Sequence, residues 1–154
     1  MKILIIEDDN NKFKKLLDVF LKKQISQENI ILKTSYNSGV RELIKNDYDF
    51  LILDMSLPIY ENEIGRNNNE IKPFAGIDIL NQMKRYEKEI PTVIVTQFEV
   101  FSLATNTREE ISITELKEKL KELKYQSYRG LIYYDVTSNY WEKDLIELLE
   151  LEKG

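Results

Sequence analysis

The sequence contains no cysteine and no histidine. Without cysteine, the chain can form neither a disulfide framework nor a thiolate metal site. Without histidine, it has no imidazole base, no histidine-ligated zinc and no histidine of its own that could carry a phosphoryl group. These two absences exclude several classes of enzyme at once.

Long apolar runs and an excess of positive charge are also missing. The longest apolar runs are far shorter than the roughly 20 residues of a membrane-spanning helix. Met1 and Lys2 lead directly into a predicted strand rather than into a signal peptide. The net charge of −5 argues against general affinity for nucleic acid backbones. We therefore expect a cytoplasmic protein that has neither nucleic acid nor a membrane as a direct partner.

The sequence does contain a regular alternation of strand and helix patterns. Its 154 residues, 42% hydrophobic and 32% charged, are typical of one globular domain with a hydrophobic core. Because parallel strands need helical crossovers, the alternation predicts a flavodoxin-like, doubly wound α/β sheet with strand order 2-1-3-4-5. We expect a single domain over residues 1–154, without an attached output domain.

The predicted elements are set by apolar runs and helical periodicity. The strands are expected at 2–6, 30–34, 50–53, 92–96 and 131–134. The helices are expected at 11–24, 38–45, 76–86, 112–124 and 140–151. Two long loops are expected at 59–75 and 98–111, and loops of such length inside a compact domain are usually functional or disordered.

Acidic residues follow two of the predicted strands. Glu7 and Asp8 come directly after the first strand, and Asp54 comes directly after the third. In the predicted order these strands are neighbours, so their carboxyl ends bring three carboxylates into one crevice. Mg²⁺ relieves the repulsion in such a cluster, and a carboxylate there can also form an aspartyl-phosphate. Thr96 ends the fourth strand, and we expect its hydroxyl to face the same crevice.

Simpler roles remain open for each of these residues. Asp8 and Asp9 are good caps for the helix that follows them, and Asp54 alone could cap a loop. Threonine also has a high β-propensity, so its presence at the end of a strand is ordinary. The convergence of the carboxylates on adjacent strand ends is what favours a metal site over capping.

Four segments carry a resemblance to a known family. They read KILIIED at 2–8, LILDMSLP at 51–58, GID at 76–78 and PTVIVT at 91–96. With these segments in this order, the chain resembles the receiver domains of two-component response regulators. The resemblance implies a stand-alone signalling protein in which phosphorylation alters the binding of a downstream protein partner. It implies no enzymatic activity beyond self-catalysed phosphoryl transfer to and from the acceptor, and it is compatible with a homodimer.

The resemblance also implies roles for individual residues. Asp54 would accept the phosphoryl group from a histidine kinase or a phosphotransfer protein. Mg²⁺ would be bound by Asp8 and Asp54 directly, by Glu7 through water, and by the backbone carbonyl of Ser56. Thr96 would provide the switch hydroxyl that moves toward the phosphoryl group.

The sequence departs from the family pattern after the fifth strand. Receivers normally carry a lysine there, whose ammonium offsets the phosphoryl charge, but residues 131–138 read LIYYDVTS. Arg129 lies before the strand, and Lys143 in the last helix would have to reach back. Gln97 also follows Thr96, where the family usually has a small residue. A side chain of that length could crowd or gate the crevice.

These departures leave two other functions open. The first is a pseudo-receiver, which would use the fold as a protein-interaction module independent of phosphorylation. The second is a Mg²⁺-dependent phosphohydrolase, which the sequence favours less. Phosphatases with an aspartyl nucleophile generally place a second aspartate two residues further on, and here that residue is Ser56.

Overall fold

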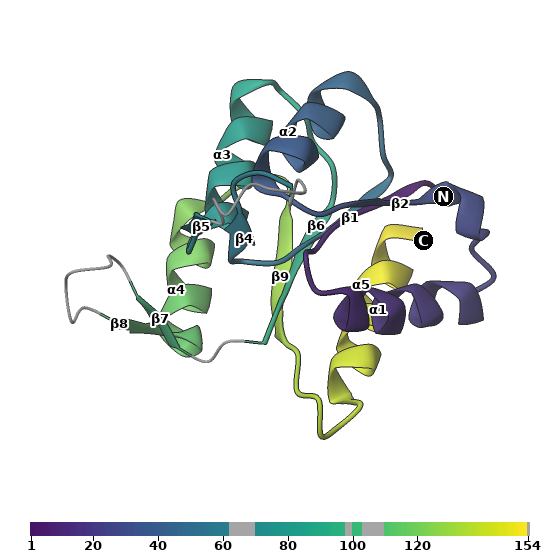
Figure 1. Ribbon diagram of the computed structural model, residues 1–154. Helices are drawn as coiled ribbons and strands as arrows, with labels where there is room; N and C mark the ends of the chain where they lie inside the picture. Colours follow the sequence, from purple (N-terminus) through teal and green to yellow (C-terminus); the bar gives the residue numbers. More distant parts are fainter. Residues whose placement is uncertain (62–69, 98–99, 103–109, 154) are drawn as a thin grey trace.

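Five parallel strands form the central sheet of the computed structural model, which describes residues 1–61, 70–97, 100–102 and 110–153. The strands lie in the order β2-β1-β3-β6-β9 (Figure 1). Their bounds are β1 (Ile3–Ile6), β2 (Ile30–Lys33), β3 (Phe50–Leu53), β6 (Thr92–Thr96) and β9 (Tyr128–Tyr133). The predicted doubly wound sheet is therefore confirmed, and β1 and β3 are neighbours.

Helices cover both faces of this sheet. Figure 1 shows α1 and α5 on one side, and α2, α3 and α4 on the other. Their bounds are α1 (Asn10–Lys22), α2 (Tyr36–Lys45), α3 (Ala75–Arg85), α4 (Ile113–Leu123) and α5 (Tyr140–Lys153). A single 3₁₀ turn, Gln27–Asn29, precedes β2. In the part of the chain that the structure describes, no helix is both long enough and apolar enough to span a membrane.

Alternating strand residues divide the core into two layers. In β1, Leu4 and Ile6 pack toward α2, α3 and α4, whereas Ile3 and Ile5 pack toward α1 and α5. This follows from the two-residue period of a strand, which points successive side chains to opposite faces. Because both faces of the sheet are buried at its centre, β1 and β3 are continuous apolar runs rather than alternating ones.

Two short antiparallel pairs lie where we expected long loops. The predicted loop at 59–75 is bounded by β4 (Leu57–Pro58) and β5 (Ile71–Lys72), which pair with each other. In the predicted loop at 98–111, β7 (Val100–Ser102) pairs with β8 (Glu110–Ser112). Strands of two or three residues are too short for a periodic sequence pattern, so the sequence did not reveal them. The remainder of both predicted loops, 62–69, 98–99 and 103–109, lies outside the described residues.

Replacing Phe20 with alanine tests the packing of α1 on the sheet. Phe20 is 0% exposed, so Phe20→Ala should leave a cavity and lower the free energy of unfolding by about 3–5 kcal/mol. The neighbouring Leu21 is 39% exposed, and Leu21→Ala should cost less than about 1 kcal/mol. Urea denaturation measures both changes, and equal losses would contradict this orientation of α1.

Candidate functional site

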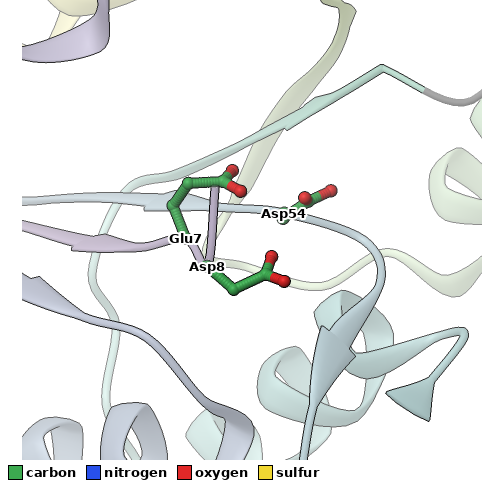
Figure 2. Close-up of side chains that lie close together, drawn as sticks. All are labelled: Glu7, Asp8 and Asp54. Atoms are coloured by element: carbon green, nitrogen blue, oxygen red, sulfur yellow. The ribbon is translucent and has the colours of Figure 1, made fainter. Parts of the chain in front are cut away.

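Three acidic side chains meet at the carboxyl ends of β1 and β3. Glu7, Asp8 and Asp54 each offer a carboxylate oxygen, and these oxygens all lie within 4.8 Å of one another (Figure 2). The sheet itself fixes this geometry, because Asp54 N–H donates to the carbonyl of Ile6 at 3.1 Å and Glu7 N–H donates to the carbonyl of Lys33 at 2.9 Å. The predicted convergence of the three carboxylates is observed.

The turn that carries Asp54 is held in place by the start of α3. Gly76 N–H donates to the carbonyl of Met55 at 2.9 Å. A Cβ atom at Gly76 would lie 3.2 Å from the Asp54 carbonyl oxygen and 3.2 Å from the Met55 Cα. Since both of these are backbone atoms, a larger residue at this position would push the helix and the turn apart by a few tenths of an ångström.

The acidic cluster opens into a pocket of about 140 Å³. One side of the pocket is formed by the β4–β5 pair, and Gln97 follows the end of β6 on another side. The residues that line it are Glu7, Asp8, Asp9, Asp54, Ser56, Leu57, Pro58, Ile71 and Gln97. Gln97 therefore lies at the crevice, as its position after Thr96 suggested.

A lysine that the sequence analysis did not single out lies at the centre of the site. The Lys12 side chain is only 1% exposed, and its Nζ lies 2.6 Å from Glu7 Oε2 and 3.3 Å from Asp54 Oδ2. Nζ also donates to the carbonyl oxygen of Val95 at 2.6 Å. Lys12 belongs to the first turns of α1, so the helix that follows the acidic pair also supplies its positive charge.

The proximity of these charges shifts their pKa values. Burial, and secondly the nearby Asp54 carboxylate, raise the pKa of Glu7, while the Lys12 ammonium opposes the shift. Burial and Asp54 also raise the pKa of Asp8. Burial alone would lower the pKa of Lys12, but the carboxylates of Asp54 and Glu7 reverse this effect and raise it. Lys12 is therefore a charged ammonium at neutral pH.

One oxygen of Asp54 has no hydrogen-bond partner among the described residues. Asp54 Oδ2 contacts Lys12, but Oδ1 is buried and unpaired. A buried carboxylate oxygen without a partner carries a desolvation cost, which a hard cation or a covalent bond at that atom would remove. Together with the oxygens of Glu7 and Asp8, it makes a donor set that fits Mg²⁺, which binds through carboxylates and retains several waters.

The remaining residues predicted for the site differ in their surroundings. Ser56 lines the pocket, two residues after Asp54. Thr96 ends β6 as expected, but its side chain is fully buried and is not part of the pocket lining. Its carbonyl accepts a hydrogen bond from Tyr134 N–H at 2.7 Å.

The helical periodicity of α1 contains a signal for Lys12. Leu16 and Phe20 are fully buried on this helix, and Lys12 lies four and eight residues before them, on the same face. Extending the buried stripe toward the N-terminus would have placed Lys12 at the sheet rather than in solvent. A lysine in an amphipathic helix ordinarily lies on the solvent face, so the pattern of apolar residues alone does not indicate that Lys12 is buried.

Comparison with known proteins identifies a relative over nearly the full chain. The chain is 30% identical over 149 residues to the Detocs response regulatory protein DtcB of Enterobacter cloacae (strain JD6301), covering 96% of this chain and 97% of the relative. No protein-family model matches the sequence.

Solved structures support the same fold. A two-component response regulator from Clostridium difficile superposes with a TM-score of 0.60 at 16% identity, covering 100% of this chain and 99% of the other. The receiver domain of a sensor histidine kinase from Pseudomonas aeruginosa PAO1 superposes with a TM-score of 0.60 at 12% identity, covering 99% and 98%. The latter was solved with a magnesium ion coordinated in its active site cleft.

Replacing Asp9 tests the start of the helix that carries Lys12. The Asp9 side chain accepts hydrogen bonds from the N–H groups of Asn11 at 2.9 Å and Lys12 at 3.2 Å. Asp9→Ala removes this cap and should lower the free energy of unfolding by about 1 kcal/mol. Asp9→Asn keeps an acceptor and should retain most of the stability. Urea denaturation of both variants is the measurement, and equal losses would show that the hydrogen bonds accepted by Asp9 do not account for the effect.

Proposed function

The chain belongs to the receiver-domain family of response regulators, and on that basis we propose that it accepts a phosphoryl group on Asp54 with the aid of Mg²⁺. Phosphorylation would then alter its affinity for a downstream protein. The observation that carries this proposal is the unpaired Oδ1 of Asp54, buried beside two further carboxylates at a pocket.

Within this proposal, the acidic residues hold the metal ion. Asp8 and Asp54 would be direct ligands, Glu7 would act through water, and Ser56 would contribute its backbone carbonyl. When bound, Mg²⁺ supplies positive charge to the oxygens of the transferring phosphoryl group. Mg²⁺ in the cleft of the Pseudomonas receiver domain supports this assignment. Thr96 would serve as the switch hydroxyl, which requires its buried side chain to move toward the pocket.

A phosphohistidine donor would lie outside residues 1–154, because this sequence contains no histidine. In the proposed transfer, an oxygen of the Asp54 carboxylate attacks the phosphorus of a phosphohistidine on a kinase or phosphotransfer protein. The P–O bond forms as the P–N bond breaks, and the electron pair goes to the histidine nitrogen, which takes up a proton. Asp54 then carries an acyl phosphate.

A second candidate is a pseudo-receiver that binds its partner without phosphorylation. The ion pairs that favour it are those of Lys12 with Glu7 and Asp54. Because this ammonium already offsets part of the buried negative charge, a pseudo-receiver would not require a metal ion in order to fold. The two candidates differ in whether Asp54 reacts.

Beryllofluoride, an analogue of a phosphoryl group, distinguishes the two candidates. With Mg²⁺ present, we expect the wild-type protein to form a beryllofluoride adduct, because Asp54 Oδ1 is available as a ligand. Asp54→Asn should abolish the adduct, whereas Asp18→Asn on the exposed side of α1 should not. Fluorine NMR detects the bound species. A wild-type protein that binds Mg²⁺ but forms no adduct would favour the pseudo-receiver.

Mg²⁺ should also stabilise the folded protein. A ligand that binds only the native state at 100 times its dissociation constant adds about 2.7 kcal/mol to the free energy of unfolding. Asp8→Asn should remove most of this increment, since Asp8 is the exposed member of the cluster and the one accessible to a hydrated ion. Urea denaturation with and without Mg²⁺ measures the increment. An equal increment in Asp8→Asn would exclude Asp8 as a ligand.

A further inference from the structure

We propose that Lys12, on the first helix, supplies the positive charge that stabilises the phosphoryl group on Asp54. It would thus take the place of the lysine that receivers carry after the fifth strand. This inference rests on the proposed function, because it assigns a role to Lys12 in the same phosphoryl transfer.

The position of the ammonium is fixed by its three contacts. Lys12 Nζ has three N–H donors, and it lies within reach of three acceptors, one each from Glu7, Asp54 and Val95. The contact with Val95 is to a backbone carbonyl of β6, which cannot move away when the carboxylates change partners. The ammonium is therefore held beside Asp54 before any phosphoryl group arrives.

The position of the Lys12 ammonium suits it to offset the negative charge that a phosphoryl group would add. Transfer to Asp54 brings additional negative charge into a site that already contains the carboxylates of Glu7 and Asp8. A fixed positive group at the reacting atoms stabilises such charge without having to reorganise during the reaction. Lys12 contacts Oδ2 of Asp54 and leaves Oδ1 without a partner. The same carboxylate thus has one oxygen on the ammonium and the other available for the phosphorus.

The residue after the fifth strand adjoins Lys12. Tyr134 directly follows β9, and Lys12 Nζ lies 5.8 Å from the centre of its ring. The helix therefore delivers an ammonium close to the position from which the family's lysine would reach. The other two cations considered from the sequence have different contacts: Arg129 pairs with Glu152 at 2.7 Å, and Lys143 lies 6.0 Å from the ring of Tyr140.

The competing role for Lys12 is purely structural. In that case the ammonium would only offset the burial of Glu7 and Asp54, and removing it would lower stability without affecting the phosphoryl analogue. The two roles are separated by comparing the affinity for Mg²⁺ with the affinity for beryllofluoride at saturating Mg²⁺.

The central experiment uses Lys12→Met, which removes the charge and keeps the length of the side chain. We expect its beryllofluoride affinity to fall by about tenfold or more, as for the loss of a charged hydrogen bond. Its Mg²⁺ affinity should stay equal or increase, because a cation next to the ligands is gone. Lys12→Arg should restore most of the beryllofluoride affinity. The matched control is Lys15→Met, which removes an exposed lysine of the same helix and should behave like the wild type.

A double variant tests directly whether Lys12 takes the place of the lysine that other receivers carry after the fifth strand. In Lys12→Met combined with Tyr134→Lys, the ammonium is moved to the position after the fifth strand. This double variant should recover beryllofluoride affinity relative to Lys12→Met alone.

The outcomes separate the inference from the proposed function. Adduct formation in the wild type that is undiminished in Lys12→Met would overturn the role of Lys12 alone. The absence of an adduct in the wild type would overturn the proposed function, and this inference with it.

A measurement on the wild type keeps the inference testable if Lys12→Met does not fold. With lysine labelled by ¹³C at Cε, the Lys12 signal should shift when beryllofluoride is added to the Mg²⁺-saturated protein, and the Lys15 signal should not. Lys12→Arg assigns the signal. A Lys12 signal that beryllofluoride leaves unchanged would overturn the inference.

Discussion

The burial of two carboxylates beside one ammonium is the constraint on which this structure depends. Glu7 and Asp54 lie at the ends of adjacent strands with almost no exposure, and the cost of burying like charges is offset by Lys12 between them. Removing one member of such a group leaves the other charges buried without a partner. This lowers the free energy of unfolding far more than replacing the whole group with apolar residues would. The sheet order, the first turns of α1 and the carbonyl of Val95 must therefore all be in place for the site to exist.

The sequence was sufficient for the sheet and for the acidic cluster. Apolar runs such as residues 50–53 predict buried parallel strands, and parallel strands put their carboxyl ends at one edge. That reasoning alone places Glu7 and Asp8 beside Asp54, as the structure does. The assignment required no side-chain detail, because backbone pairing between β1 and β3 determines it.

The sequence did not predict the cation of the site, because that depends on the direction in which one long side chain points. Lys12 could extend into solvent or toward the sheet, and only the position of Leu16 and Phe20 on the same face indicates the second. The absence of a lysine after the fifth strand therefore did not mean the absence of a cation. The β4–β5 pair was missed for a different reason, since strands of two residues are too short to carry a periodic pattern.

A series of side-chain contacts connects the acidic site to α5, the last helix of the chain. The ring of Tyr134 lies 5.8 Å from the Lys12 ammonium and packs against Trp141 in a tilted arrangement, with ring centres 4.9 Å apart. Trp141 is the single tryptophan of the sequence and is buried at the start of α5. Trp141 thus lies three contacts away from Asp54, through Tyr134 and Lys12, so displacement of the ammonium would change the tryptophan emission of an unlabelled sample.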